Sequence, residues 1–198
     1  MNSNLTEIIC IVDRSGSMSS MRDDAIGGFN SFVMDQKNDV GEVRMTLVLF
    51  DNEYDIVYDV LPLHLVPLLT HDTFVPRGST ALLDAIGKTI DDVGERLAKT
   101  PEADRPGHVI MTILTDGEEN SSQHYSNAAV AARISHQRDA YGWEFIFLAA
   151  NQDAIASAAK LSIASSDAIC FEASPKGMVQ GWDAINAGVR SRRQAKRS

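Results

Sequence analysis

The feature that most constrains the fold of this 198-residue chain is the alternation of short apolar runs with segments of helical periodicity. The runs read as buried strands, because they are only a few residues long and are bounded by turn residues. The predicted strands cover residues 7–12, 42–52, 53–63, 108–117, 143–151 and 167–173. The predicted helices cover residues 18–37, 79–99, about 126–141, 152–162 and 175–194. This order predicts an α/β domain in which helices cover both faces of a mostly parallel sheet.

The link between the second and third predicted strands is short, a turn of Asp51, Asn52 and Glu53. Such a link predicts an antiparallel hairpin, because a parallel return needs a long crossover. We therefore expect a doubly wound, Rossmann-like sheet with one antiparallel edge strand. No internal repeat or low-complexity linker divides the chain, which favours one domain over 1–198, with a core at about 5–190 and a basic helix end at 190–198.

Composition excludes several classes of partner. The net charge of −9 disfavours nonspecific nucleic-acid binding. No stretch approaches the roughly 20 apolar residues of a membrane span, so no membrane partner is expected. Cys10 and Cys170 both lie in short apolar runs and read as buried, reduced core residues. A cytoplasmic location is the corresponding expectation.

Small polar residues follow the first predicted strand at the point where it ends. The stretch IICIVDRSGSM, residues 8–18, places Asp13 after the apolar run and Ser15 and Ser17 at the next alternate positions. A turn explains such residues, and so does a site that holds a cation.

Two further polar side chains are expected at the same edge of the sheet. Asp116 ends a later strand, in ILTDGEEN, and Thr80 lies at the start of a helix, where a hydroxyl is favourable. Ligands of open α/β sheets collect outside the C-terminal ends of the strands. If the two strands are central neighbours, Asp13 and Asp116 meet there and Thr80 supplies a third group.

The predicted cluster offers only oxygen ligands, three hydroxyls and two carboxylates. Mg²⁺ takes about six oxygens at roughly 2.0–2.1 Å, whereas a set without His or Cys disfavours Zn and Cu. We therefore expect Mg²⁺, with Mn²⁺ or Ca²⁺ as alternatives. Neutral hydroxyls leave the ion electrophilic, so an Asp or Glu of a protein partner is expected to complete the coordination.

Three segments together carry a resemblance that the D-x-S-x-S pattern alone does not. VDRSGSM, GSTALLDAI and ILTDGEEN resemble, in order and spacing, the three motif segments of the von Willebrand factor type A (vWA) family. The resemblance covers about residues 5–190. It implies a doubly wound sheet with a metal-ion-dependent adhesion site (MIDAS) at its upper edge, in a family of binding modules that mediate adhesion, scaffold assemblies or work beside ATPases.

The resemblance also implies which residues bind the metal. By position they are Asp13, Ser15, Ser17, Thr80 and Asp116. The two serines and the threonine would contact the ion, and the aspartates would act directly or through water.

Five charged residues flank the predicted site, and each has an ordinary explanation. Asp84 is expected to complement the helix dipole, with a place near the metal as the alternative. Glu118 and Glu119 are expected to form a solvated acidic loop, with tuning of cation or partner choice as the alternative. Arg14 and Arg77 either repel a wrong cation, meet an acidic partner, or are plain surface charges.

The expected function is a non-catalytic, cation-dependent protein-binding module. No Ser/His/Asp or Cys/His arrangement and no glycine-rich phosphate loop is evident in the sequence. A Mg²⁺-dependent phosphoryl-transfer enzyme of the phosphatase type is one alternative. It is disfavoured because the haloacid-dehalogenase-like pattern wants a second carboxylate where Ser15 stands. A structural domain with a vestigial metal site is the other alternative.

Overall fold

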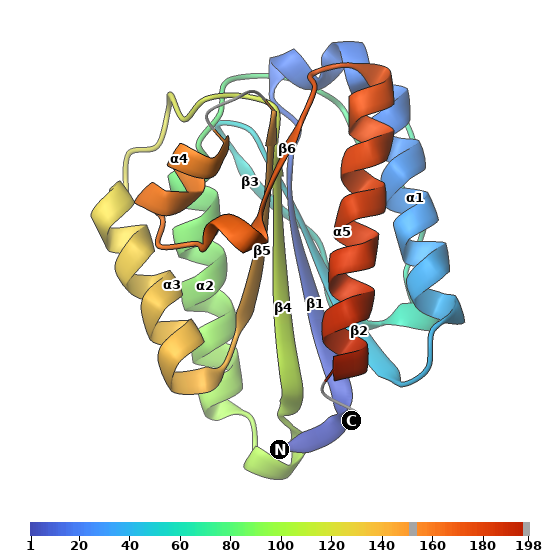
Figure 1. Ribbon diagram of the computed structural model, residues 1–198, viewed down its shortest axis with the longest axis vertical. Coiled ribbons are helices and arrows are strands. Elements are labelled where there is room, and N and C mark those ends of the chain that lie inside the picture. The colour runs from blue at the N-terminus through green and yellow to red at the C-terminus, as the bar shows by residue number, and fades with distance from the viewer. Residues whose placement is uncertain (151–153, 196–198) are drawn as a thin grey trace.

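The computed structural model describes residues 1–150 and 154–195, and these form a six-stranded sheet between two layers of helices (Figure 1). The strands are β1 (Asn2–Asp13), β2 (Glu42–Phe50), β3 (Tyr54–Pro62), β4 (Pro106–Thr115), β5 (Glu144–Ala150) and β6 (Ala168–Phe171). The helices are α1 (Arg22–Asn38), α2 (Leu82–Lys99), α3 (Asn127–Tyr141), α4 (Ala154–Lys160) and α5 (Pro175–Ala195).

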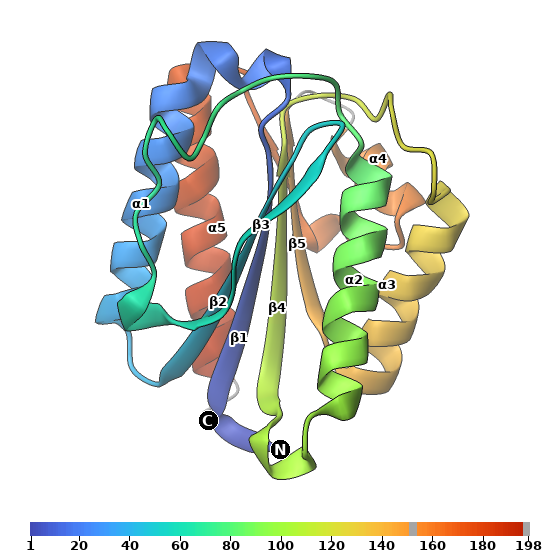
Figure 2. The same cartoon turned by 180° about the vertical axis from the view of Figure 1, so that it is seen from behind.

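The strand order is β3-β2-β1-β4-β5-β6. All neighbouring strands pair in parallel except β2 and β3, which are antiparallel and place β3 at an edge. Helices α1 and α5 cover one face, and α2, α3 and α4 cover the other (Figures 1 and 2). The predicted fold class, a doubly wound and mostly parallel sheet with one antiparallel edge strand, is confirmed.

Strand β1 is buried on both faces. Ile8, Cys10 and Val12 belong to the core beneath α1 and α5. Ile9 and Ile11 belong to the core beneath α2 and α3. The run is apolar throughout because a central parallel strand has no solvated face. The polar residues Asp13 and Ser15 follow directly after this apolar run.

Helices α1 and α5 pack closely at Gly28. A Cβ atom there would lie 2.1 Å from Cδ1 of Trp182, and Phe29 packs its ring edge-on against the same indole at 5.5 Å between centroids. The missing side chain of Gly28 therefore admits a tryptophan of the C-terminal helix, whereas a Cβ at the adjacent Gly27 would meet no atom within 4 Å.

Two predicted helices begin later than their periodicity indicates. The segment predicted as a helix from residue 18 is first a 3-10 helix, η1 (Gly16–Met21), in which the Ser19 hydroxyl donates to the Gly16 carbonyl over 2.7 Å. Helix α2 begins at Leu82, because Ala81 before it has a non-helical backbone, with φ −95° and ψ 61°. The Thr80 amide donates to the side chain of Asn120 over 2.9 Å. Thr80 was expected at the start of the helix, but the N-cap is Ala81 and Thr80 lies one residue before it.

Two other expectations at the C-terminal end also change. Cys170 is exposed, because it lies on the short edge strand β6. Arg193, from the predicted basic helix end, is buried and donates to the Gln36 side chain over 2.5 Å and the Val40 carbonyl over 3.0 Å. The parts of the predicted strand and helix that fall at 151–153 lie outside the described residues. Across the described ranges, no helix combines the length and apolar character needed to cross a membrane.

Candidate metal centre

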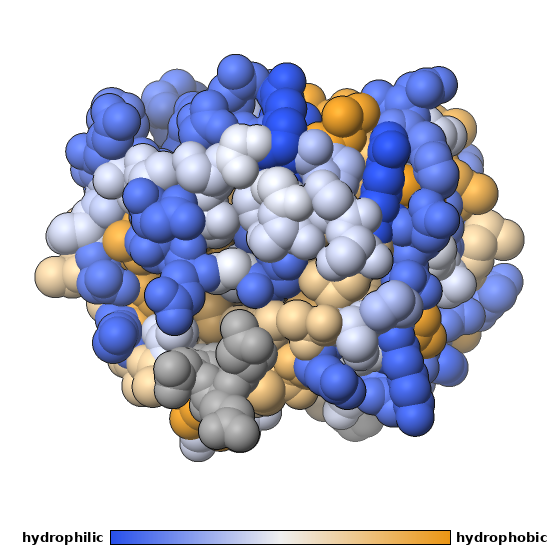
Figure 3. All heavy atoms as spheres, turned by 90° about the horizontal axis from the view of Figure 1, so that it is seen from above, coloured by the Kyte–Doolittle hydropathy of each residue, from blue (hydrophilic) through white to orange (hydrophobic). Residues whose placement is uncertain are grey.

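Three loops meet at the C-terminal edge of the two central strands. β1 ends at Asp13 and β4 ends at Thr115, and the pairing of Val12 with Leu114 places these ends side by side. The segment that leads into α2 forms the third side. Seen from above, a pale band of weakly polar atoms crosses this face, bordered by strongly hydrophilic side chains (Figure 3). This face therefore carries residues of intermediate hydropathy, with strongly hydrophilic residues at its border.

A chain of hydrogen bonds connects the first loop to the end of β4. The Ser17 hydroxyl donates to Oδ1 of Asp116 over 2.7 Å and lies 3.0 Å from the Ser15 hydroxyl. The carboxylate of Asp13 accepts the Ser15 backbone N–H over 2.6 Å and the Thr115 hydroxyl over 2.6 Å. Four of the five predicted residues are thus brought together directly or through Thr115.

Thr80 joins the same cluster beside Gly117. An atom at the Cβ position of Gly117 would lie 3.1 Å from the Thr80 hydroxyl, 3.6 Å from that of Ser17 and 4.0 Å from that of Ser15. The three hydroxyls, which come from two different loops, therefore all lie within 4.0 Å of one point beside Gly117.

Both carboxylates of the cluster are buried, and no cationic side chain within residues 1–150 and 154–195 bonds to either of them. Asp13 is fully buried, and burial raises its pKa to about 6, although hydrogen bonds from Thr115 and Ser15 offset part of the rise. Burial also raises the pKa of Asp116, which the hydrogen bond from Ser17 partly offsets. A raised carboxyl pKa means that the charged form lacks stabilisation, which a bound cation supplies.

The donor set fits a hard divalent cation. It consists of oxygens alone, as Mg²⁺ prefers, and its neutral hydroxyls outnumber its carboxylates. Within the described ranges, no group of three or more His, Cys, Asp and Glu is placed to hold a metal. The cluster at Asp13 and Asp116 contains two acidic residues and is therefore a different type of candidate, one that relies on hydroxyls.

Sequence reasoning missed two residues that support the cluster. Thr115 immediately precedes Asp116 and bonds to Asp13, and a hydroxyl at the end of an apolar strand was the available signal. Asp51 read only as part of a turn, yet it is fully buried and accepts from the Nε atoms of both Arg14 and Arg77 at 2.9 Å. The two arginines are therefore ion-paired and are not plain surface charges.

Glu119 and Asp84 attach the loop after β4 to the start of α2. The Glu119 carboxylate accepts the Leu83 amide over 2.9 Å and the Ser122 amide over 2.7 Å. Asp84 accepts three consecutive backbone amides, those of residues 123–125, at 2.8–2.9 Å. Glu119, which was expected in a solvated acidic loop, therefore accepts from an amide at the start of α2. Asp84, which was expected to complement the helix dipole, binds the backbone of the loop after β4. Glu118 is exposed.

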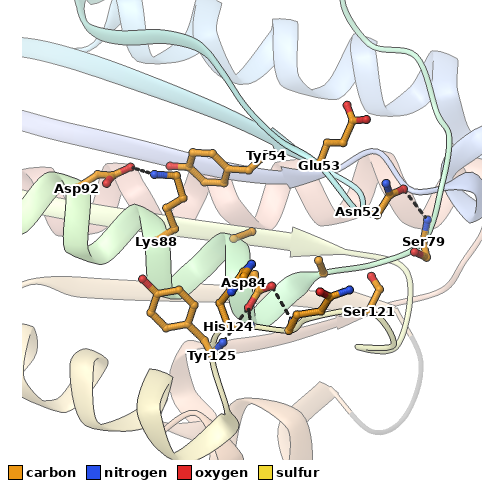
Figure 4. Close-up of a pocket in the computed structure, with 13 residues that line it drawn as sticks. Asn52, Glu53, Tyr54, Ser79, Asp84, Lys88, Asp92, Ser121, His124 and Tyr125 are labelled. Atoms are coloured by element: carbon orange, nitrogen blue, oxygen red, sulfur yellow. Dashed lines mark hydrogen bonds and ion pairs between the residues drawn. The ribbon is translucent and has the colours of Figure 1, made fainter.

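A cavity of about 830 Å³ opens beside this attachment, between the β2–β3 turn and α2 (Figure 4). Ser79 and Ala81, the two neighbours of Thr80, line it. On its far side the Lys88 ammonium lies 5.0 Å from the centre of the Tyr54 ring and 2.9 Å from Asp92. His124 also lines this cavity, and its backbone amide belongs to the Asp84 contact described above.

No protein-family model matches the sequence, and no curated protein matches it. Solved structures do match the fold. Proximal thread matrix protein 1 from the mussel byssus, with a zinc-occupied MIDAS motif, superposes with a TM-score of 0.64 at 14% identity, over 96% of this chain and 47% of that one. A von Willebrand factor type A protein from Catenulispora acidiphila gives 0.58 at 15% identity, over 92% of this chain and 42% of that one.

A third match has nearly the same length as this chain. The vWF domain of the type V pili tip protein Mfa5 from Porphyromonas gingivalis gives a TM-score of 0.59 at 12% identity, over 94% of this chain and 95% of that one. By contrast, the chain spans about half the length of the mussel structures it matches. At such identities the likeness establishes the vWA fold and nothing finer.

Proposed function

We propose that this chain is a non-catalytic protein-binding module of the vWA type whose binding depends on a divalent cation. The observation that carries the proposal is the convergence of the Ser15, Ser17 and Thr80 hydroxyls on one space beside Gly117. These hydroxyls would hold the cation together with Asp13 and Asp116. The zinc-occupied motif of the mussel protein supports a divalent ion at this place in the fold.

The expected ion is Mg²⁺, since hydroxyl and carboxylate oxygens are its preferred ligands. When bound, the ion supplies an electrophilic position that a partner's Asp or Glu occupies. The chain's own residues keep that position available: three neutral hydroxyls leave much of the ion's charge uncompensated. Thr115 and the Ser15 amide meanwhile fix the orientation of Asp13. A cytoplasmic location, with Cys10 as a buried thiol, completes the proposal.

A phosphoryl-transfer enzyme is less compatible with the geometry. Its nucleophile would be Asp13, but both oxygens of that carboxylate accept hydrogen bonds and the side chain is fully buried. The position two residues on holds a serine instead of a second carboxylate. A phosphatase screen with Mg²⁺ tests this alternative directly, because turnover that disappears in Asp13→Ala would reverse the assignment.

The central experiment measures the binding of the cation by itself, without a protein partner. Calorimetric titration with Mg²⁺, Mn²⁺, Ca²⁺ and Zn²⁺ is carried out on the wild type and on Thr80→Ala, with Ser79→Ala as the matched control because its hydroxyl is outside the cluster. Loss of binding in Thr80→Ala alone supports the site. Equal binding by both variants, or no binding by the wild type, refutes it and favours a vestigial site.

The second measurement addresses the partner. The immobilised chain is offered crosslinkable peptides that differ only in carrying Asp, Asn or Ala at the centre, with Mg²⁺ or with excess chelator. The proposal requires retention that depends on both the carboxylate and the cation. Retention that survives the chelator would contradict it.

A further inference from the structure

Asp51 occupies an unusual position for a carboxylate. It follows β2 directly and is fully buried, although the turn that contains it lies at the surface. Its Oδ2 atom accepts from Nε of Arg14 and from Nε of Arg77, each at 2.9 Å, and its Oδ1 accepts the Glu53 amide at 2.6 Å. Burial alone would raise the pKa of Asp51, but these donors together lower it below its ordinary value. A buried carboxylate that accepts this many hydrogen bonds holds its donors, here Arg14 and Arg77, in defined positions.

The two arginines belong to the two loops that supply the hydroxyls. Arg14 stands between Asp13 and Ser15, and Arg77 lies three residues before Thr80. The Arg77 amide donates to the Arg14 carbonyl over 2.9 Å. One carboxylate therefore holds both loops at the point where their backbones touch.

The backbone around this contact is tightly fitted. The Gly16 amide donates to the Gly78 carbonyl over 3.2 Å. Gly78 has a φ of +66°, and a Cβ there would lie 1.9 Å from Oδ1 of Asn52. Figure 4 shows Asn52 against Ser79, whose amide it accepts over 3.4 Å. The β2–β3 turn thus packs directly against residues 78–79, which lead into Thr80.

We propose that Asp51 is a positioning residue for the cation, acting through Arg14 and Arg77 on the spacing between the Ser15–Ser17 loop and Thr80. We call Asp51, Arg14 and Arg77 the Asp51 bracket. The inference rests on the proposed cation-binding function and deepens it, since it assigns part of the cation affinity to residues that supply no ligand. Partners of metal ligands commonly change metal affinity when they are altered.

A simpler explanation is that these charges act on the cation only through their electric field. The two explanations predict opposite signs for Arg77→Gln. Removal of a positive charge near a cation site strengthens binding if the field alone matters. If Asp51 acts by positioning, loss of the Arg77 side chain weakens cation binding instead, by about tenfold if the effect has the usual size for a residue that supports metal ligands.

The experiment is calorimetric titration of the full chain with Mn²⁺. Arg77→Gln and Asp51→Asn are both expected to bind Mn²⁺ about tenfold more weakly than the wild type. Asp55→Asn is the matched control, because Asp55 also pairs with Arg14, at 2.5 Å, but its side chain is 52% exposed. Its substitution removes the same charge as Asp51→Asn and should change the affinity by less than about twofold. Since Arg77 is half-exposed, Arg77→Gln carries the test even if Asp51→Asn does not fold.

Amide hydrogen exchange of the metal-free chain provides a readout independent of the cation. The Gly16 amide, which bonds to Gly78 across the two loops, should exchange faster in Arg77→Gln and at the wild-type rate in Asp55→Asn. If Arg77→Gln binds Mn²⁺ as tightly as the wild type or more tightly, the positioning role of Asp51 is overturned but the proposed function is not. A wild type that binds no Mn²⁺ overturns the proposed function and this inference with it.

Discussion

Substitution of Gly117 by alanine is the sharpest perturbation of the candidate site. The added methyl would lie 3.1, 3.6 and 4.0 Å from the hydroxyl oxygens of Thr80, Ser17 and Ser15, so it would take up the space beside all three. We expect Gly117→Ala to bind Mn²⁺ at least about 100-fold more weakly, a change of about 2.7 kcal/mol. A cation with oxygens at roughly 2.0–2.1 Å cannot share that space with a methyl group.

The same substitution should leave the fold nearly unchanged. Gly117 is not among the glycines with positive φ, so alanine adopts its backbone conformation. The 3.1 Å contact requires the Thr80 hydroxyl to move by a few tenths of an ångström. The lower entropy of the unfolded chain offsets this strain by about 0.4–1 kcal/mol, so the free energy of unfolding should stay within about 1 kcal/mol of the wild type.

The assay pairs calorimetry of Mn²⁺ binding with urea unfolding monitored by tryptophan fluorescence. Gly27→Ala is the control, because a Cβ there meets no atom within 4 Å. It should bind Mn²⁺ like the wild type. Wild-type Mn²⁺ affinity in Gly117→Ala would refute the reasoning, since the cation would then lie elsewhere.

Three further predictions concern stability. Gly28→Ala should destabilise the fold by about 1–3 kcal/mol in urea unfolding, because its Cβ would lie 2.1 Å from Trp182. Glu119→Gln should lower the unfolding free energy by about 1–2 kcal/mol, since charge-assisted bonds to the start of α2 are weakened, and amide exchange at Leu83 should accelerate. Burial would raise the pKa of Asp84, but three backbone amides lower it below 3.8. Its carboxylate therefore contributes stability above pH 3.8 that is lost as the pH falls through the folded-state pKa, and Asp84→Asn should unfold with a shallower acid dependence.

Features that depend on short local stretches of sequence could be predicted. The continuous apolar run of β1 identified a central parallel strand, and the three-residue turn after β2 identified the antiparallel edge. The meeting of Asp13 with Asp116 was predicted on the condition that their two strands are central neighbours, and the pairing of β1 with β4 meets that condition.

Features that depend on contacts between distant segments were not accessible. Asp51 is chemically an ordinary turn residue, and only the tertiary fold places Arg14 and Arg77 on its carboxylate. Arg193 lies in the predicted basic helix end, and its burial could not be predicted because its partner, Gln36, is 157 residues away in the chain. The predicted start of α2 was too early because Ser79, Thr80 and Ala81 form a non-helical segment whose bonds run to Asn52 and Asn120, far away along the chain.

The bonds that close the cluster also determine when it forms. Ser17 and Asp116 are separated by 99 residues, and Asp13 and Thr115 by 102. Two strands and two helices, β2, β3, α1 and α2, separate β1 from its neighbour β4 along the chain. Pairings of such long sequence separation form slowly. A nascent chain that ends at α2 therefore carries every hydroxyl of the site but cannot assemble it, so Mn²⁺ binding during refolding should appear only in the final phase and report a completed sheet.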